Sequence, residues 1–253
     1  ERKLAKMSTR IVAISEKQKE ELAMEHQICS ANKIEVIPLG FDLQRFQDEQ
    51  DEKRNVFRTE FKLNDEDIAI GIIGRLVPIK NHELFLNAIK YVKQHSNKRV
   101  KAFIVGDGES RSEIEEQCSE LDLTYSNDSE DDVDVYFTSW VKKVDYVNAG
   151  VDIVALTSKN EGTPVSLIEA QASNRAIVST NVGGIENIVL PELTALLSDP
   201  SDEKKFKENL LRMIEDEKLR VKFGEQGWSF VENKFHYQRL VEDITNLYDS
   251  LLS

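Results

Sequence analysis

DIAIGIIG, residues Asp67–Gly74, is a short and almost continuous apolar run. Such a run is typical of a strand that is buried on both faces of a sheet. NHELFLNAIKYVKQ (Asn81–Gln94) follows it with apolar residues at helical spacing and with Asn81 as a plausible N-cap. VKAFIVGDG (Val100–Gly108) is then a second apolar run that closes in a glycine turn. This order predicts neighbouring parallel strands with a helix between them.

The same alternation continues toward the C-terminus and predicts an α/β fold with a doubly wound, Rossmann-like parallel sheet. Ligands of such sheets bind at the carboxyl ends of the strands, near the switch in strand order. We expect further strands over Val135–Trp140, Val151–Ser158, Arg175–Asn181 and Leu193–Asp199, and further helices over Glu109–Leu121, Pro164–Ser173 and about residues 202–215, 218–233 and 237–252.

The first part of the chain predicts a separate, shorter series of elements. RIVAIS (Arg10–Ser15) is expected to be a buried strand, followed by a helix to Gln27 that Ser15 caps. Ile34–Gly40 predicts a short strand. The polar residues from Gln44 to about Arg54 are interpreted as a connector, so the complete domain is expected to begin near residue 55.

The charge balance restricts the classes of ligand. Asp and Glu number 46 against 33 Lys and Arg, which gives a net charge of −13. A negative field repels nucleic-acid phosphates, so we expect no nucleic-acid partner. An anionic ligand must therefore meet a few well-placed basic groups. The acidic loop SNDSEDDVD (Ser126–Asp134) is interpreted as a solvated loop rather than a cation site.

Cysteine and histidine usage indicates a cytoplasmic protein without a bound metal. The two cysteines, Cys29 and Cys118, form no C-x-x-C motif, which favours a reducing compartment. The four histidines are scattered, and no Cys/His/Asp cluster has the spacing of metal ligands. There is no apolar run of roughly 20 residues that would predict a membrane span.

A candidate anion site follows the first strand of the complete domain. In GRLVPIKN, Gly74 permits a tight turn, and Arg75 and Lys80 bracket the loop before the helix at Asn81. Cations beside a helix N-terminus favour a phosphate, because free amides and the helix dipole add to their charge. Two solvated basic residues in a loop remain the alternative.

GDGESR (Gly106–Arg111) matches a dinucleotide fingerprint incompletely. It gives G-x-G, but Arg111 stands in place of the third glycine, and the segment ends the second strand of the domain rather than the first. We therefore do not expect NAD or FAD, and we interpret the segment as a tight turn between strand and helix.

NEGTPVSLIEA (Asn160–Ala170) places two carboxylates eight positions apart. With Thr163 as N-cap and Pro164 at the first helical position, Glu169 falls in the second turn of the helix. Eight helical residues span roughly 12 Å, too far for Glu161 and Glu169 to share a proton. Free amides lie between them at Val165 and Ser166. This order suits a ligand with hydroxyls at both ends and phosphates between, such as a nucleotide-sugar; unrelated surface glutamates are the alternative.

At these residues the chain resembles a known family. EGTPVSLIEA looks like the E-x7-E motif of retaining GT-B glycosyltransferases of the large family usually numbered four, and GRLVPIK resembles their G-R-x4-K segment. VGDGES, VDIVALTS and NVGGIEN (Asn181–Asn187) follow in the expected order, so the resemblance covers nearly the whole chain. Two positions depart from the family pattern: Asn81 replaces a glycine, and Asn174-Arg175 replaces Gly-Pro, where asparagine suits a left-handed C′ position.

The resemblance implies a glycosyltransferase (hexosyltransferase type, EC 2.4) with particular site residues. The catalytic residues would be Arg75, Lys80 and Glu161. Arg75 and Lys80 would bind the donor diphosphate and stabilise negative charge on the leaving nucleotide, and Glu161 would contact the transferred sugar. Glu169 would accept hydrogen bonds from the ribose hydroxyls. Ser139–Val141 would lie by the nucleobase, chiefly through the backbone, with Trp140 either stacking on the base or packing. The full set of donor-binding residues would be Gly74, Trp140, Val141, Gly162, Thr163, Pro164, Val165, Ser166 and Glu169.

The resemblance also implies how the chain is organised and what it binds. Residues 1–42 would be the tail of an N-terminal GT-B domain with the hinge, 43–236 the nucleotide-sugar-binding domain, and 237–253 a helix crossing toward the N-terminal domain. The donor would be a UDP-, GDP- or ADP-sugar, with no metal or other cofactor. A glycan or lipid-linked acceptor would bind the missing N-terminal domain, and peripheral membrane association of the full-length enzyme stays open. Alternatives are a GT-B nucleotide-sugar epimerase, a non-catalytic nucleotide-sugar-binding module and, less favoured, a Rossmann oxidoreductase.

Overall fold

The computed structural model describes residues 1–252, which form two compact units. One unit combines Glu1–Leu43 with the C-terminal residues from Val231 onward. The other is the continuous segment Gln44–Phe230. The first boundary lies one residue from the predicted start of the nucleotide-sugar-binding domain, while the second lies six residues before its predicted end.

The larger unit is built on a parallel sheet of seven strands within the described residues. Their spatial order is β5-β6-β4-β3-β7-β8-β9, so the order reverses between β3 and β7. This is a doubly wound arrangement, and it confirms the predicted fold class. The strands are β3 (Ile68–Ile73), β4 (Val100–Val105), β5 (Tyr125–Ser126), β6 (Val135–Ser139), β7 (Ile153–Leu156), β8 (Ala176–Thr180) and β9 (Ala195–Ser198).

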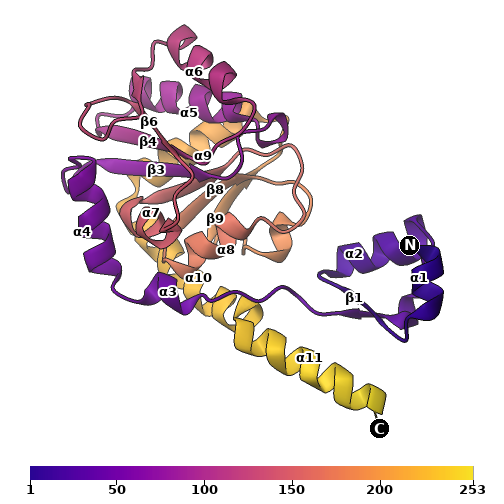
Figure 1. The fold of residues 1–253 in the computed structure, drawn as a ribbon. Coiled ribbons are helices and arrows are strands. Elements are labelled where there is room, and N and C mark those ends of the chain that lie inside the picture. The colour runs from indigo at the N-terminus through magenta and orange to yellow at the C-terminus, as the bar shows by residue number, and fades with distance from the viewer. Residues whose placement is uncertain (253) are drawn as a thin grey trace. The chain divides into compact units, whose positions relative to one another are not determined.

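Helices cover both faces of this sheet (Figure 1). One face carries α5 (His82–His95), α6 (Arg111–Glu120) and α9 (Glu203–Glu215), and the other carries α4 (Gln50–Glu60), α7 (Val144–Gly150) and α8 (Val165–Ala172). Successive residues of β4 therefore pack against different helices, on opposite faces of the sheet. Ile104 joins the apolar core beneath α5 and α9, whereas Phe103 packs on the opposite face against Phe57 and Tyr136. The long helix α10 (Glu217–Phe235) leaves this unit at its C-terminal end.

The predicted polar connector over Gln44–Arg54 is wrong, because this segment forms α3 (Gln44–Gln47) and the start of α4. Most of its polar side chains face solvent, but two basic ones make ion pairs with carboxylates that are largely buried. Lys53 pairs with Asp145 at 3.1 Å, and Arg54 pairs with Asp152 at 2.7 Å. An element held by ion pairs shows little apolar periodicity, so the sequence pattern did not indicate it.

Helix ends differ from the predictions in two places. Pro164, rather than Thr163, is the N-cap of α8, because its ψ of 104° is extended and the first helical residue is Val165. Asn81 does precede α5, but its side chain makes no capping hydrogen bond and its backbone is left-handed, with φ of 52°. Asn174 adopts the predicted left-handed conformation after α8, with φ of 57°.

The smaller unit contains a two-stranded parallel sheet of β1 (Ile11–Ala13) and β2 (Ile34–Val36). Val12 is 43% exposed, so the first strand is less buried than predicted. Ser15 caps α2 (Glu16–Glu20) as expected, accepting a 3.1 Å hydrogen bond from the Gln18 amide, but the helix continues only as a π-turn to Glu25. The described helices of this unit also include α1 (Arg2–Met7) and α11 (Tyr237–Leu252).

Two segments that are distant in the sequence, residues 38–41 and 235–239, meet within this smaller unit. The Phe41 amide donates to the Phe235 carbonyl at 2.8 Å, and the Tyr237 amide donates to the Phe41 carbonyl at 3.0 Å. Arg239 of α11 donates to the carbonyls of Pro38 and Leu39 at 2.7 and 2.6 Å. Helix α11 is thus joined to the N-terminal segment by backbone and side-chain hydrogen bonds.

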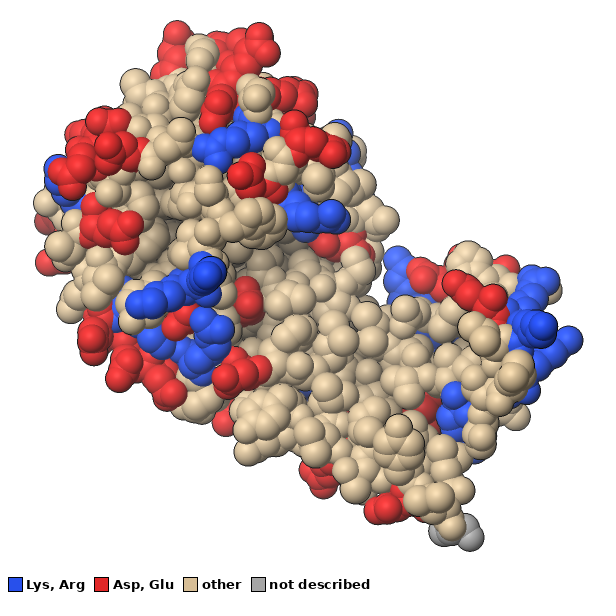
Figure 2. Space-filling view, viewed as in Figure 1, with Lys and Arg blue, Asp and Glu red and all other residues tan. Residues whose placement is uncertain are grey.

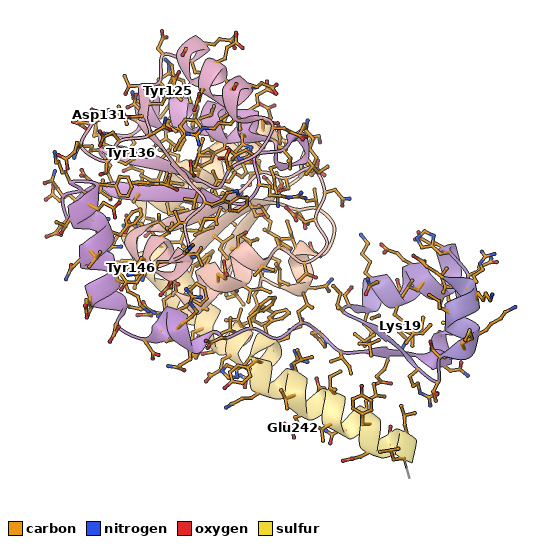
Figure 3. The ribbon with its side chains drawn as sticks, in the orientation of Figure 1. Lys19, Tyr125, Asp131, Tyr136, Tyr146 and Glu242 are labelled. Carbon is orange, nitrogen blue, oxygen red and sulfur yellow. The ribbon has the colours of Figure 1, made fainter. Side chains whose placement is uncertain are left out.

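The acidic loop 126–134 is tethered to the sheet rather than free. Figure 3 shows Asp131 and Tyr136 close to one another, and the Tyr136 hydroxyl donates to the Asp131 carbonyl at 2.7 Å. Asp132 accepts from Lys101 at 2.5 Å and from Arg99 at 2.8 Å. These donors hold the pKa of Asp132 at about 2, with the hydrogen bond from Lys101 as the larger cause.

Candidate functional site

The loops that follow β3 and β7 carry the predicted catalytic residues, and they lie side by side where the strand order reverses. Gly74–Lys80 leaves the carboxyl end of β3, and Asn160–Thr163 follows β7. Two hydrogen bonds tie the loops together. The Lys159 amide donates to the Ile79 carbonyl, and the Thr157 hydroxyl donates to the Lys80 carbonyl, both at 2.8 Å. The crevice at this position is where a doubly wound sheet binds ligands.

Lys80 and Glu161 form an ion pair across these two loops. Lys80 Nζ lies 2.5 Å from Glu161 Oε1, and the same oxygen accepts a 2.6 Å hydrogen bond from the Ser158 hydroxyl. The lysine and glutamate side chains are 19% and 11% exposed, so water screens the pair only weakly. The ammonium group predicted to meet a diphosphate is thus neutralised by the carboxylate predicted to meet the sugar. Ser158, which the sequence analysis did not single out, holds that carboxylate.

The backbone of Glu161 rests on a glycine turn after β8. The Gly184 amide donates to the Glu161 carbonyl at 3.1 Å. Gly183 is left-handed, with φ of 58°, and a Cβ at this position would lie 1.8 Å from the Glu161 carbonyl oxygen. The two glycines of NVGGIEN therefore allow the close approach that fixes the position of Glu161.

Arg75 differs from Lys80 in having no side-chain partner in the part of the chain that the structure describes. Its side chain is exposed, and no hydrogen bond or ion pair of its guanidinium occurs among residues 1–252. Gly74 lies beside Lys80, because a Cβ built at position 74 would be 3.9 Å from Lys80 Nζ. His82, at the start of α5, is buried, and burial followed by the charge of Lys80 lowers its pKa to about 4. His82 is therefore neutral at pH 7, and Arg75 is available to a ligand.

Helix α8 begins at Val165, four residues after Glu161 and one residue later than predicted. Val165 and Ser166 are its first two residues, so their amides have no intrahelical acceptor and lie at the positive end of the helix. Gly162 is exposed, and a Cβ at this position would meet no atom within 4 Å. The backbone from Gly162 to Ser166, including Thr163 and Pro164, therefore combines open space with amide donors, which is an arrangement that suits an anionic group.

Glu169 lies in the second turn of α8 with its side chain half-buried. Burial raises its pKa to about 7, the nearby Arg45 guanidinium opposes this shift, and the Asp145 carboxylate adds to it. Arg45 is itself held at 2.6 Å by Asp145. The sequence analysis missed Arg45, which comes from α3, more than a hundred positions before Glu169. Glu169 is thus poised to change charge close to neutral pH.

Trp140 and Val141 lie at the edge of a hollow of about 730 Å³. The walls come from α4, from α7 and from the loops on either side of β6, and include Phe57, Phe61 and Tyr146. The other predicted site residues do not line it. Trp140 is 63% exposed, so it is not a packing residue of the core.

Figure 2 shows that basic side chains on the visible face gather in small groups among acidic ones.

The comparison with protein families settles the class of the chain. Residues 53–229, which include every predicted site residue, match the family model described as glycosyl transferases group 1. The chain belongs to this family. The match spans β3 to β9 and the loops that carry Arg75, Lys80, Glu161 and Glu169.

Several named relatives are similar to this chain along nearly its whole length. It is 28% identical over 250 residues to the capsular polysaccharide biosynthesis glycosyltransferase CapM of Staphylococcus aureus, covering 97% of this chain and 62% of the relative. It is 26% identical to a UDP-Gal:alpha-D-GlcNAc-diphosphoundecaprenol alpha-1,3-galactosyltransferase of Escherichia coli, covering 96% of this chain and 61% of the relative. The chain thus spans about three-fifths of the length of the relatives that it matches.

Solved structures show the same fold. The Anabaena protein Alr3699/HepE in complex with UDP-glucose superposes with a TM-score of 0.80 at 20% identity, over 96% of this chain and 64% of that chain. WaaG, a glycosyltransferase involved in lipopolysaccharide biosynthesis, gives a TM-score of 0.78 at 15% identity, over 92% and 61%. These likenesses establish the architecture alone.

Two further properties follow from the described part of the chain. None of the helices within residues 1–252 has the length and apolar character that crossing a membrane requires. Over the same residues, no group of three or more His, Cys, Asp and Glu side chains is arranged to hold a metal ion.

Proposed function

We propose that this chain is the donor-binding part of a retaining glycosyltransferase of family four, a hexosyltransferase that moves a sugar from a nucleotide-diphosphate-sugar to an acceptor. The observation that carries the proposal is the pairing of Lys80 with Glu161 across the switch point. The loop of Lys80 also carries Arg75, which has no ion-pair partner within residues 1–252, and the loop of Glu161 leads to the first amides of α8, which have no intrahelical acceptor. The group 1 family and the UDP-sugars in the names of its relatives support this proposal. The acceptor, a glycan or a lipid-linked sugar, would bind a part of the enzyme outside this chain.

In the proposed mechanism, the donor diphosphate displaces Glu161 from Lys80. A diphosphate carries more negative charge than a carboxylate and can contact Lys80, Arg75 and the α8 amides together. Glu161 would stay hydrogen-bonded to Ser158 and offer its released oxygen to a hydroxyl of the sugar. One ion pair would thus be exchanged for two contacts at opposite ends of the scissile bond.

Charge stabilisation would supply much of the catalysis. The bond between the anomeric carbon and the phosphate oxygen breaks, and negative charge develops on the departing diphosphate. Fixed cations and amides that meet this charge lower the barrier without reorganising. We propose that the acceptor attacks from the face that the diphosphate leaves, so that no protein nucleophile and no metal take part.

Calorimetric titration with UDP-glucose, GDP-mannose and ADP-glucose tests the donor site. We expect the 253-residue chain to bind at least one of them, and Glu169→Gln and Arg75→Ala to bind that donor about tenfold more weakly, as expected when one charged hydrogen-bonding group is lost. Binding of none of the three, or binding by both variants that is as tight as that of the wild type, would show that the site is wrongly assigned.

A further inference from the structure

Ser139, the last residue of β6, has a backbone conformation that is unusual for serine. Its φ is 54°, in the left-handed region that non-glycine residues seldom adopt without support. The register between β4 and β6 is irregular here, since Ile104 pairs with Phe137 but Val105 pairs with Ser139. Such a bulge turns the chain sharply. It therefore sets the direction in which Trp140 and Val141 leave the sheet.

Arg111 supports this conformation from the first turn of α6. Its Nη1 donates to Ser139 Oγ at 2.8 Å, and its Nε donates to Glu115 Oε1 at 2.9 Å. Nη2 donates to Asn127, and the guanidinium lies 5.3 Å from the centre of the Phe137 ring. The side chain is 21% exposed. The guanidinium is thus fixed on several sides, so its contact with Ser139 is rigid.

The backbone of Ser139 is tied in turn to the loop that carries Arg75 and Lys80. Its carbonyl accepts a 2.9 Å hydrogen bond from the Gly106 amide. Gly106 has φ of 137°, and a Cβ at this position would lie 1.9 Å from the Gly74 carbonyl oxygen. The ends of β6, β4 and β3 therefore meet backbone to backbone.

We propose that Arg111, which stands where a dinucleotide fingerprint would have its third glycine, is a positioning residue for the nucleoside end of the donor. It holds Ser139 left-handed and so aims the backbone of Trp140 and Val141 at the base of a nucleoside diphosphate. Arg111 itself does not touch the ligand, because its donors are directed to Ser139, Glu115 and Asn127. The ligand in this inference, a nucleoside diphosphate, rests on the proposed function. The effect of Arg111 on the backbone of Ser139 does not.

Hydrogen exchange tests the backbone effect without any nucleotide. In Arg111→Ala and in Ser139→Ala, we expect the Gly106 amide and the peptide covering residues 138–141 to exchange about tenfold faster, since a strained conformation loses its anchor. The double variant should exchange no faster than either single one, because both remove the same contact. Unchanged exchange in the single variants, or additive effects in the double one, would overturn the proposal.

A rescue variant separates positioning from general loss of structure. Glycine adopts positive φ without strain, so Arg111→Ala combined with Ser139→Gly should restore much of the protection at Gly106. If Arg111 only stabilises the start of α6, the glycine would not help. Failure of this rescue would therefore contradict the positioning role.

Titration then connects the backbone to the ligand. The test uses whichever of UDP, GDP and ADP the wild-type chain binds best. Arg111→Ala should bind this nucleotide about tenfold more weakly, because the backbone that meets the base has lost its anchor. Inorganic pyrophosphate, which has no base, should bind both proteins within a factor of about two. Equal loss for pyrophosphate would overturn the positioning role, whereas binding of no nucleotide by the wild-type chain would contradict the proposed function and leave the exchange test to decide on Arg111.

Discussion

Lys80 and Glu161, 81 positions apart in the sequence, form an ion pair of 2.5 Å between the loops that follow β3 and β7. Both side chains are largely buried, and Ser158 supplies the only other polar contact of the carboxylate among the described residues. Each charge therefore depends on the other in the ligand-free protein. The predictions for Lys80 and Glu161 follow from how this pair responds when one partner is removed or when an anion arrives.

Removing one charge of the pair should destabilise the fold. Lys80→Ala leaves Glu161 buried without its counter-charge, and we expect a loss of about 1–3 kcal/mol in the free energy of unfolding. Glu161→Gln keeps the shape and the contact with Ser158 but leaves Lys80 unpaired, so a similar loss is expected. Urea denaturation at pH 7 measures both. Stability equal to that of the wild type in both variants would show that the pair contributes nothing.

Arg75→Ala should affect ligand binding without affecting stability. The guanidinium has no partner among residues 1–252, so its loss should change the free energy of unfolding by less than about 0.5 kcal/mol. Lys204→Ala, at a solvent-exposed position of α9, removes the same charge away from the site and serves as the control. If both variants weaken donor binding equally, the effect belongs to net charge rather than to a contact of Arg75.

Gly183→Ala should displace Glu161. The left-handed backbone at Gly183 and the 1.8 Å approach of a Cβ to the Glu161 carbonyl predict a loss of about 2 kcal/mol or more. Gly162→Ala is the matched control for stability, because a Cβ at Gly162 meets no atom within 4 Å. Thermal unfolding of the two variants compares them directly. A smaller loss at Gly183 than at Gly162 would contradict the proposed support of Glu161.

Glu169 should make donor binding depend on pH. Its pKa of about 7 in the folded chain means that it is largely protonated at pH 6 and ionised at pH 8. Ribose hydroxyls donate to a carboxylate, so affinity for a nucleotide-sugar should rise between pH 6 and pH 8. A nucleotide-sugar has no phosphate group that titrates in this range, and His82 stays neutral throughout because its pKa is about 4. Glu169→Gln should bind with an affinity that does not follow this rise.

The same carboxyl group should also make stability depend on pH. Burial raises its pKa above the ordinary value of 4.5, so the folded chain holds a proton that the unfolded chain has lost. The stability associated with the neutral form is therefore present below about pH 4.5 and is lost as pH rises through 7. Glu169→Gln should consequently be more stable than the wild type at pH 8, with a smaller difference at pH 5. A constant difference across this range would contradict the raised pKa.

The sequence was sufficient to predict the sheet and to place the candidate site residues at the ends of its strands. Apolar runs fixed most strands of the larger unit, and parallel strands bring their carboxyl ends to one edge. Arg75, Lys80 and Glu161 each follow such a strand, so their common location could be expected. Lys80 pairs with Glu161, whereas Arg75 forms no ion pair with any residue from 1 to 252. This difference depends on side-chain geometry that no local pattern contains.

The supporting contacts could not be predicted for the same reason. Arg45 and Asp145, which act on Glu169, are a hundred positions apart and lie on helices with little apolar periodicity. Ser139 is left-handed although nothing in its local sequence favours that conformation. The turn at Gly183 supports the site because the Glu161 carbonyl packs against it, and this contact is not visible in the local sequence. Local propensity describes the elements, whereas long-range contacts determine how the site is held.

Titration of the wild-type chain, Glu161→Gln and Lys80→Ala with UDP, GDP and ADP tests the central claim, that Lys80 passes from Glu161 to the donor diphosphate. The wild type should bind at least one nucleotide. Glu161→Gln should bind it about three- to tenfold more tightly, because Lys80 is already released, and Lys80→Ala should bind it about tenfold more weakly. Binding that is unchanged in Lys80→Ala, or weaker in Glu161→Gln than in the wild type, would contradict the exchange of partners.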